Sequence, residues 1–248
     1  MSEKPLISVI TVTYNAGNCI GKTLESLKEQ TFGEFEHIVV DGASKDDTVK
    51  IIKERGLPGT VLISEPDRGL YDAMNKGLHM STGKYVLFLN AGDRLHDTET
   101  LSRYADGAKE NADIVYGDTI IVDSEGNKIA DRHLKAPERL TKESFSKGML
   151  VCHQAFLAKR EISPEFDLNY RFSADYDWCV KCLEKSEPEK CLNLNAVTID
   201  YLSDGLTDKN KIKSLKERFR IMVKHYGLTK TIANHIGFVF RSLKRGRL

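Results

Sequence analysis

Polar and acidic residues follow an apolar run of this chain at the point where the run ends. Val86–Leu89 is a run of four apolar residues, and it is followed by Asn90, Ala91, Gly92 and Asp93. Such a run predicts a strand buried on both faces, and open α/β sheets bind ligands just beyond the carboxyl ends of their strands. Asp93 is therefore placed to hold a metal ion or a ligand hydroxyl. The alternative is an ordinary turn before the next helix, since Asn, Gly and Asp are common turn formers.

A second group of charged residues, Asp67, Arg68 and Asp72, lies at the start of a short predicted helix. Arg68 suits a phosphate there, because the free N–H groups of a helix N-terminus and a guanidinium both favour an anion. Asp67 or Asp72 is placed to hold a ligand hydroxyl. The alternative is a capped, solvated helix start. Asn75 and Gly77 are expected to fix the packing of this helix rather than to contact substrate.

The elements that position these residues alternate between strand and helix as far as Asp93, which predicts a parallel sheet. Strands are predicted at Ile7–Thr13, Phe35–Val40, Thr60–Ser64 and Tyr85–Leu89. A helix with Ile20, Leu24 and Leu27 on one face follows the first strand. A helix through Arg55, opened by Ser44 and Asp47 as a capping pair, follows the second, and Gly69–Met80 follows the third.

After the helix Thr98–Lys109 the pattern becomes a mixed α+β arrangement. Further strands are predicted at 113–123, 150–157 and 192–201, with Gly126-Asn127 as a hairpin-type turn. Helices are predicted at 174–185, 209–226 and 231–243. Trp178, in the first of these, is expected in the core.

The net charge of +1 conceals an asymmetry. Lys209–Leu248 contains twelve Lys or Arg and one acid, Glu217, which gives +11, so the first 208 residues carry −10. A basic tail on an acidic body indicates an anionic surface, and the aliphatic residues of the tail suit a helix lying on a membrane leaflet. A helix packed on the body, or a dimer contact, is the equal alternative. Nucleic acid is the weaker interpretation, because basic and aromatic residues interleave little.

Several classes of protein and site do not fit the sequence. We expect no signal peptide and no spanning helix, which needs about 18 apolar residues. Five cysteines without a secretory signal indicate a reducing, cytoplasmic compartment. The Gly-x-Gly-x-x-Gly turn of dinucleotide oxidoreductases and the P-loop are missing. Cys179-x-x-Cys182 lies inside a helical pattern without a second such pair, which argues against structural zinc.

The order of these motifs resembles the family 2 glycosyltransferases. The resemblance is carried by Thr13-Tyr14-Asn15 after the first strand, by the segment from Asp41 to Thr48 after the second, and by the acidic turn after the fourth. The segment from Glu65 to Gly77 is similar to a subgroup that assembles bacterial surface polysaccharides. The resemblance covers about residues 5–205. It implies the α/β GT-A fold, with a Rossmann-like, mostly parallel central sheet, a mixed α+β acceptor half and C-terminal helices.

The resemblance also implies a nucleotide-diphospho-sugar donor and a division of the chain. Residues 1–110 would form the nucleotide-sugar-binding half, 111–205 the acceptor-binding and catalytic half of the same domain, and 206–248 a basic helical extension. Thr13 and Tyr14 would line the base pocket, and Asp41 would accept from the base or the ribose. The alternatives are a loop-capping acid for Asp41 and a core ring for Tyr14. The remaining donor-binding residues would be Asn15, Asp67, Arg68, Asp72, Asn90, Ala91 and Gly92.

The acidic turn corresponds to the Asp-x-Asp motif of the family, from which this sequence departs. Asn90-Ala91-Gly92 occupies the motif, and Asp93 is the following position. Asp93 is the carboxylate left in this turn to hold Mg²⁺ or Mn²⁺, with donor phosphates and waters as the other ligands. The ion would neutralise the leaving diphosphate. One carboxylate predicts weak or donor-dependent metal binding, and metal independence stays an alternative.

Inverting transfer needs a base that takes the proton of the acceptor hydroxyl. The segment from Phe172 to Trp178 is similar to the family's acidic segment at a helix start, and Asp175 matches the base position. Asp177 is the second candidate and an acceptor or diphosphate contact. The alternative for Asp175 is a helix-start acid favoured by the macrodipole. His153 and Gln154, on the strand predicted before this segment, would face the donor or acceptor, and a satisfied buried histidine is the alternative.

We therefore predict an inverting glycosyltransferase of cell-surface polysaccharide synthesis. It would move a sugar from a nucleotide-diphospho donor to a hydroxyl of a glycan or lipid-linked acceptor, with the basic tail as a candidate contact to the inner membrane face. The rival interpretation is a nucleotide-sugar-binding module without catalysis, which the depleted Asp-x-Asp motif indicates. A nucleotidyltransferase is a weaker rival, because its Gly-rich, lysine-containing first loop is missing. The sequence gives no oligomeric state.

Overall fold

A computed structural model describes residues 4–203 and 211–244, and a nine-stranded sheet lies at its centre. The strands run in the order β3-β2-β1-β4-β8-β6-β9-β5, with β7 paired to β6. The first four strands are parallel, β8 is antiparallel to both its neighbours, and β6 is parallel to β9. Their bounds are β1 Ile7–Thr13, β2 Phe35–Asp41, β3 Val61–Ser64, β4 Tyr85–Phe88, β5 Arg94–Leu95, β6 Ile114–Val122, β7 Lys128–Asp131, β8 Phe156–Lys159 and β9 Cys191–Leu202.

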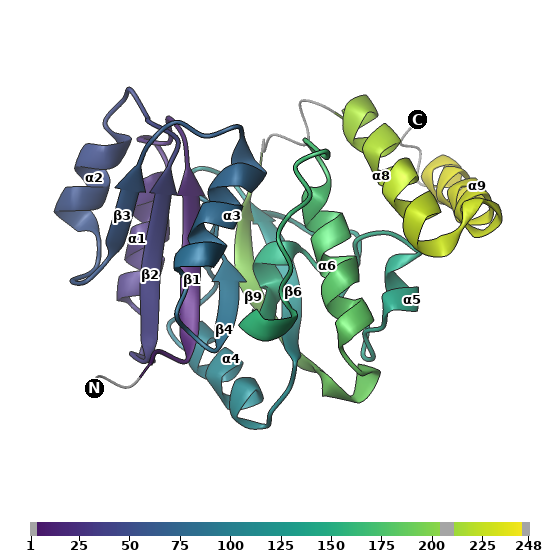
Figure 1. The fold of residues 1–248 in the computed structure, drawn as a ribbon, viewed down its shortest axis with the longest axis horizontal. Helices are drawn as coiled ribbons and strands as arrows, with labels where there is room; N and C mark the ends of the chain where they lie inside the picture. Colours follow the sequence, from purple (N-terminus) through teal and green to yellow (C-terminus); the bar gives the residue numbers. More distant parts are fainter. Residues whose placement is uncertain (1–3, 204–210, 245–248) are drawn as a thin grey trace.

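The helices follow the predicted pattern to within a few residues. They are α1 Ile20–Lys28, α2 Thr48–Arg55, α3 Leu70–Met80, α4 Thr100–Lys109, α5 Lys142–Phe145, α6 Ala174–Lys185, α8 Lys211–Tyr226 and α9 Leu228–Lys244, with short 3-10 turns η1 His153–Ala155, η2 Arg160–Ile162 and η3 Pro188–Lys190. In Figure 1, α2 and β3 lie at one end of the molecule, and α8 and α9 lie at the other, beyond α6. No helix within residues 4–203 and 211–244 has both the length and the apolar character needed to cross a bilayer.

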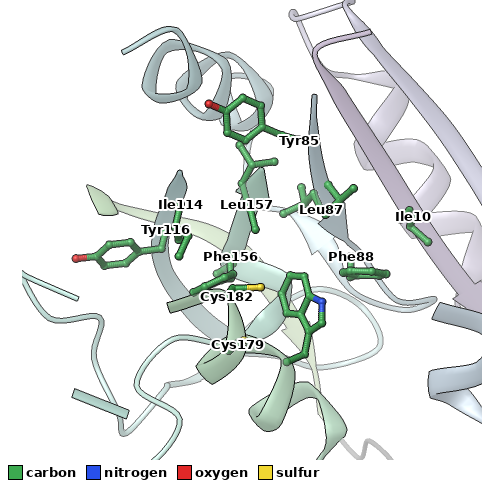
Figure 2. Packing of buried hydrophobic residues seen from close by; sticks show 14 of the residues in the cluster. Ile10, Tyr85, Leu87, Phe88, Ile114, Tyr116, Phe156, Leu157, Cys179 and Cys182 are labelled. Atoms are coloured by element: carbon green, nitrogen blue, oxygen red, sulfur yellow. The ribbon is translucent and has the colours of Figure 1, made fainter. Parts of the chain in front are cut away.

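Alternation along the strands explains how helices cover both faces of the sheet. Adjacent strand residues point to opposite faces. Val39 accordingly packs with residues of α1 and α2, whereas Ile38 and Val40 join a larger cluster that includes α3. Figure 2 shows this larger cluster around Phe88 and Phe156. Trp178 is fully buried there and stacks on Phe166 at a centroid distance of 5.3 Å, so the prediction of a core role is confirmed.

Two residues of α3 fix its position, as the sequence predicted. Gly77 lets the helix approach β1 closely, because a Cβ at this position would lie 2.4 Å from Cγ2 of Ile10. The Asn75 side chain donates to the carbonyl of Phe166 at 3.0 Å and accepts its N–H at 2.7 Å. The second half of α3 is therefore held against β1 and against the segment around Phe166.

The strand predicted over 150–157 is wrong in its first half. Residues 153–155 form the turn η1, closed by a 3.0 Å bond from the Ala155 N–H to the Cys152 carbonyl, and β8 begins only at Phe156. In a strand, His153 and Gln154 would point to opposite faces of the sheet. The turn instead lets both buried side chains reach polar partners.

The stability of the fold should fall between about pH 6.5 and pH 4 because of His37. This residue is buried between Thr11 and Thr60, and burial lowers its pKa from 6.5 to about 4. Between these pH values His37 is protonated in the unfolded chain but not in the folded chain. The contribution of this group to the free energy of unfolding is therefore present above pH 6.5 and is lost as the pH falls. We expect a loss of about 2–3 kcal/mol from this group. Denaturant titrations of wild type and His37→Gln at several pH values measure it.

The matched control for this prediction is the exposed His79, replaced in the variant His79→Gln. The His37→Gln variant should show a flatter dependence of unfolding free energy on pH, and His79→Gln should follow the wild type. Equal slopes in all three proteins would contradict the prediction.

Candidate active site

Three of the predicted segments meet at one edge of the sheet. Thr13 is paired with Asp41 at the carboxyl ends of β1 and β2. The N–H of Ala91, just after β4, donates to the Val12 carbonyl at 3.2 Å. Since neighbouring strands lie about 4.8 Å apart, the turns after β1, β2 and β4 form one continuous edge. This is the edge where the topology of an open α/β sheet predicts ligand binding.

A chain of polar contacts joins four elements beside the end of β4. The Tyr71 hydroxyl of α3 donates to Oδ1 of Asp175 at 3.0 Å. His153 Nδ1 of η1 lies 3.2 Å from Asp175 Oδ2, in the first turn of α6. Asn90 Nδ2 lies 3.3 Å from His153 Nε2. In this orientation the Asn90 amide donates to Nε2, which leaves the histidine proton on Nδ1, directed at Asp175.

These contacts keep Asp175 ionised. Burial acts to raise its pKa, but the hydrogen bond from His153, together with Arg218 and Tyr71, brings the pKa below the usual value. Burial, reinforced by the Asp175 charge, raises the pKa of Tyr71 well above its usual value, so Tyr71 remains a neutral donor. A carboxylate offers about four lone-pair sites, so Asp175 can accept a further hydrogen bond in addition to those from His153 and Tyr71.

Asp93 lies next to this chain because Gln154 follows His153 directly. Gln154 Nε2 donates to Asp93 Oδ2 at 2.9 Å, and the Leu202 N–H, at the end of β9, donates to Oδ1 at 3.0 Å. Burial raises the pKa of Asp93 to about 6, although the hydrogen bonds from Gln154 and Leu202 oppose this shift. The turn η1 thus brings the predicted metal carboxylate and the predicted base to neighbouring positions.

The residues present fit a weakly held divalent cation. A buried carboxylate with a raised pKa is stabilised in its ionised form by a nearby positive charge. Asn90 Oδ1, in the same turn as Asp93, is buried without a hydrogen-bond partner. Both are hard oxygen ligands of the kind that Mg²⁺ and Mn²⁺ accept. Among residues 4–203 and 211–244, no group of three or more His, Cys, Asp or Glu could hold a metal ion, so phosphate oxygens and waters would supply the other ligands.

Gly92 and Ala91 shape the turn in which Asn90 and Asp93 lie. Gly92 has a φ of +102°, and a Cβ at this position would lie 2.7 Å from Cδ2 of Leu202. Its N–H donates to Thr23 Oγ1 at 2.9 Å. Ala91 packs against the small cluster between α1 and α2. The structure therefore gives both residues a positioning role, and their contact with a donor stays a prediction.

Tyr14 and Asp67 meet above Gly42, after β1 and β2. The Tyr14 side chain is 61% exposed, which excludes the alternative of a core ring. A Cβ on Gly42 would lie 2.4 Å from Asp67 Oδ2 and 3.3 Å from Tyr14 Cδ2, so the absence of a side chain here makes room for both. Thr13 is buried, and its hydroxyl has no hydrogen-bond partner. An exposed ring beside a carboxylate is a fitting place for a planar base.

Asp41 anchors its own loop, which was the alternative to a nucleotide contact. It is fully buried and accepts the Ser44 N–H at 2.9 Å, the Ser64 hydroxyl at 2.6 Å and the Ser44 hydroxyl. The Asn15 N–H donates in turn to the Ser44 hydroxyl at 2.7 Å, and the Asn15 side chain accepts the Lys45 N–H at 2.9 Å. Asp41 therefore sets the shape of the loop beside the base position.

The capping pair predicted at Ser44 and Asp47 is wrong. Ser44 is engaged with Asp41, and α2 begins at Thr48 without a side-chain cap from Asp47. Asp46 accepts the Thr48 N–H at 3.0 Å and the Gly17 N–H at 2.9 Å instead. The loop after β2 is thereby tied to the loop after β1.

Arg68 and Asp72 are engaged with each other at the start of α3. Arg68 Nη2 lies 2.7 Å from Asp72 Oδ1, and the Arg68 N–H donates to Oδ2 at 3.1 Å. The hydrogen bonds and charge of Arg68 lower the pKa of Asp72 against the effect of burial. Asp72 therefore serves to hold Arg68 rather than a sugar hydroxyl. The Arg68 side chain is 77% exposed and remains accessible to an anion.

Asp177 does not join the cluster around Asp175. A helix turns about 100° per residue, so Asp177 faces almost the opposite side of α6. Its Oδ1 lies 2.7 Å from His225 Nε2 of α8, and its Oδ2 lies 2.6 Å from Lys181 Nζ. This corrects the interpretation of Asp177 as a second base or an acceptor contact. The residue holds α8 against α6.

Comparison with known proteins decides the family. The model of "Glycosyl transferase family 2" matches residues 8–165. The chain belongs to this family. It is 34% identical over 235 residues to a PGL/p-HBAD biosynthesis glycosyltransferase of Mycobacterium tuberculosis, covering 89% of this chain and 88% of that relative. It is 29% identical over 191 residues to the amylovoran biosynthesis glycosyltransferase AmsB of Erwinia amylovora, covering 70% and 62%. The chain is thus a glycosyltransferase, which decides against the rival of a non-catalytic module.

Solved structures share the fold. S. aureus TarS 1-349 in complex with UDP-GlcNAc superposes with a TM-score of 0.70 at 19% identity, covering 88% of this chain and 66% of that chain. Glucosyl-3-phosphoglycerate synthase from Mycobacterium tuberculosis, in complex with Mn²⁺, UDP and glucosyl-3-phosphoglycerate, has a TM-score of 0.66 at 15% identity, covering 90% and 81%. The GT-A fold that the sequence predicted is confirmed.

Sequence reasoning missed Tyr71 as a member of the site. The residue lies in the recognised segment from Glu65 to Gly77, between Arg68 and Asp72, and no role was assigned to it. Its partner Asp175 is 104 residues away in sequence, and no local pattern reports such a contact. An aromatic residue with a polar tip in the first turn of a helix at the ligand edge is the signal that could have identified it.

Replacing Asp177 with Asn should destabilise the protein by loosening α8. The variant Asp177→Asn leaves His225 and Lys181 beside a neutral amide in a site where the Asp177 side chain is 0% exposed. Breaking a buried charge pair typically costs about 3 kcal/mol. Thermal denaturation measures the loss, with the exposed Asp131→Asn as control. Equal melting temperatures for the two variants would contradict the assigned role.

Proposed function

We propose that this glycosyltransferase moves a sugar, with inversion, from a nucleotide-diphospho donor to a hydroxyl of a glycan or lipid-linked acceptor in cell-surface polysaccharide synthesis. The observation that carries the proposal is the buried Asp175 carboxylate, held ionised by His153 and Tyr71 next to the turn of Asp93. The names of two relatives, for PGL/p-HBAD and amylovoran biosynthesis, support a glycan or glycolipid product. The UDP and UDP-GlcNAc complexes of structural neighbours support a uridine nucleotide.

Asp175 is the proposed base. The acceptor oxygen attacks the anomeric carbon as the bond to the diphosphate breaks, and Asp175 takes the proton of the attacking hydroxyl. The lowered pKa keeps the carboxylate charged at neutral pH, and the same charge faces the positive charge that develops on the sugar ring. His153 and Tyr71 hold the carboxylate in one orientation, which is the positioning that such a displacement requires.

Asn90 and Asp93 form the proposed donor side of the same centre. Asn90 orients His153 through its amide N–H and leaves a buried, unpartnered oxygen for a ribose or sugar hydroxyl or a cation. A divalent cation held by Asp93 would supply positive charge to the leaving diphosphate. Arg68, exposed at the start of α3, is the proposed second cation for phosphate. Tyr14 and Asp67 are the proposed contacts to the base and ribose.

The free thiols support a reducing compartment. All five cysteines are free, and burial raises the pKa of Cys179 and Cys182 in the core, so these thiols stay protonated. Free cysteines in a core are typical of proteins kept in a reducing environment. We therefore propose that the enzyme works on the cytoplasmic side of the membrane, where nucleotide sugars are its donors.

Replacing Asp175 with Asn should abolish transfer and leave donor binding nearly intact. The amide cannot take a proton, and loss of a general base typically costs about 10²–10⁴-fold in rate. Turnover is followed as nucleotide release in the presence of acceptor, and donor affinity by calorimetry. Tyr71→Phe is the graded variant, because it keeps the stacking on Phe166 and removes one hydrogen bond, and we expect a loss of about tenfold. Unaltered turnover of Asp175→Asn would remove this residue from the role of base.

Replacing Asp93 with Asn should remove the effect of a divalent cation on donor binding. With wild type, Mn²⁺ should raise the melting temperature in the presence of a nucleotide sugar, because Asp93 would hold the cation and the cation would favour the diphosphate of the donor. A panel of UDP-, GDP- and dTDP-sugars, each with and without Mn²⁺, identifies the nucleotide at the same time. Asp131→Asn is the control for a lost surface carboxylate. The metal assignment fails if Mn²⁺ shifts Asp93→Asn as much as wild type, or shifts neither.

A further inference from the structure

Exposed aliphatic side chains concentrate on the hairpin of α8 and α9. Within the described residues, the structure exposes large apolar side chains at Ile212 (71%), Leu215 (59%), Leu228 (55%), Ile232 (44%) and Ile236 (54%). Figure 1 shows the two helices at the end of the molecule, outside the layer formed by α6. An apolar group of this kind on one surface marks an interaction site.

These side chains face away from the body. The body side of α8 is defined by Ser214, whose hydroxyl lies 3.1 Å from that of Ser173, and by His225, which contacts Asp177. At about 100° per residue, Ile212 lies on nearly the opposite side of α8, and Leu215 lies on the flank between, where both side chains are exposed.

The second helix repeats the arrangement. Thr231 of α9 is buried, and the Lys230 ammonium reaches Glu143 of α5 at 2.6 Å, so this side faces the body. Leu228, Ile232 and Ile236 follow one another at intervals of four and form a separate stripe. The two helices pack against each other where the ring centroids of Phe219 and His235 lie 5.0 Å apart, so the exposed aliphatic residues of both belong to one hairpin.

The charge around the stripes is positive. Lys213, Lys216 and Arg220 of α8 are exposed beside Ile212 and Leu215. The single acid of residues 209–248, Glu217, is turned inward, where it accepts the N–H groups of Arg171 at 3.0 Å and Phe172 at 2.7 Å. A helix with an apolar stripe flanked by cations lies in the headgroup region of a bilayer, and anionic lipids strengthen that binding.

We infer that the α8–α9 hairpin docks the protein on an anionic phospholipid surface. The charge favours this occupant over a second copy joined through the same surface, because two hairpins of like positive charge would repel each other and protein interface cores are depleted in lysine. The same hairpin holds the segment before Asp175 through Glu217 and Ser214. Docking would therefore orient the acceptor side of the site relative to the membrane. The inference rests on the surface alone and stands independently of the proposed reaction.

Co-sedimentation of the full chain with lipid vesicles, in the absence of any donor, tests the inference. Wild type should bind vesicles of phosphatidylcholine with phosphatidylglycerol at low salt, and bind vesicles of phosphatidylcholine alone far more weakly. High salt should reduce the binding, because screening shortens the reach of the cations to a few ångströms. Equal binding to both vesicle types would overturn the inference.

Two sets of variants separate the apolar and the charged contributions. Ile232→Ser with Ile236→Ser should lower the vesicle partition coefficient about tenfold, while Val61→Ser with Ile129→Ser, exposed elsewhere, should not. Loss of the α8 cations should lower it by a similar factor, whereas loss of exposed cations on α1 and α2 should not. The α8 set is Lys213→Gln, Lys216→Gln and Arg220→Gln. The control set on α1 and α2 is Lys28→Gln, Lys50→Gln and Lys53→Gln.

Sedimentation equilibrium of the same proteins tests the rival occupant. A wild-type dimer that dissociates in the Ile232→Ser, Ile236→Ser variant, without vesicle binding by either protein, would assign the surface to a second copy and overturn the inference. Circular dichroism verifies that each variant is folded. Failure of sugar transfer with retained vesicle binding would reject the proposed function and leave the docking surface in place.

Discussion

The contact between Asp175 and His153 is the constraint on which the rest of the site depends. It joins α6 to the turn before β8, and through Asn90 it reaches the end of β4. A buried carboxylate is costly without compensating partners, so the chain must place a histidine and a tyrosine at the same point. The 3-10 turn η1 serves this requirement, since it directs His153 to Asp175 and Gln154 to Asp93 from consecutive positions.

The first turn of α6 divides two tasks between residues that are two positions apart. Asp175 points toward the ligand edge of the sheet, and Asp177 points toward α8, where His225 and Lys181 compensate its charge. The periodicity of the helix alone separates them. One short acidic segment therefore fixes the candidate reaction centre on one side and attaches the C-terminal hairpin on the other.

Most of the architecture could be predicted from local patterns, because β-branched strands and amphipathic helices alternate with turn residues at their ends. Asp93 was predicted from its position after a strand, and Asp175 from the resemblance of its segment to the acidic segment of the family. The turn η1 was taken for a strand, since its apolar neighbours continue the strand pattern and the reason for the turn is tertiary. Ser44 was taken for a helix cap, but the buried Asp41 competes for its hydroxyl. Tyr71 and Asp177 acquire their roles from contacts with distant segments, which no local spacing reveals.

The hydrogen bond from the Leu202 main chain to Asp93 limits how far the chain can be shortened with the site intact. The family model ends at residue 165, but Asp93 takes one of its two donors from the last residue of β9, and Gly92 lies directly against the Leu202 side chain. A fragment cut at the family boundary would retain every strand-end residue of the donor half. It would also lack Asp175 and the Leu202 N–H that donates to Asp93. The smallest piece with an intact centre must therefore extend through α8, where Glu217 closes the loop that leads into α6.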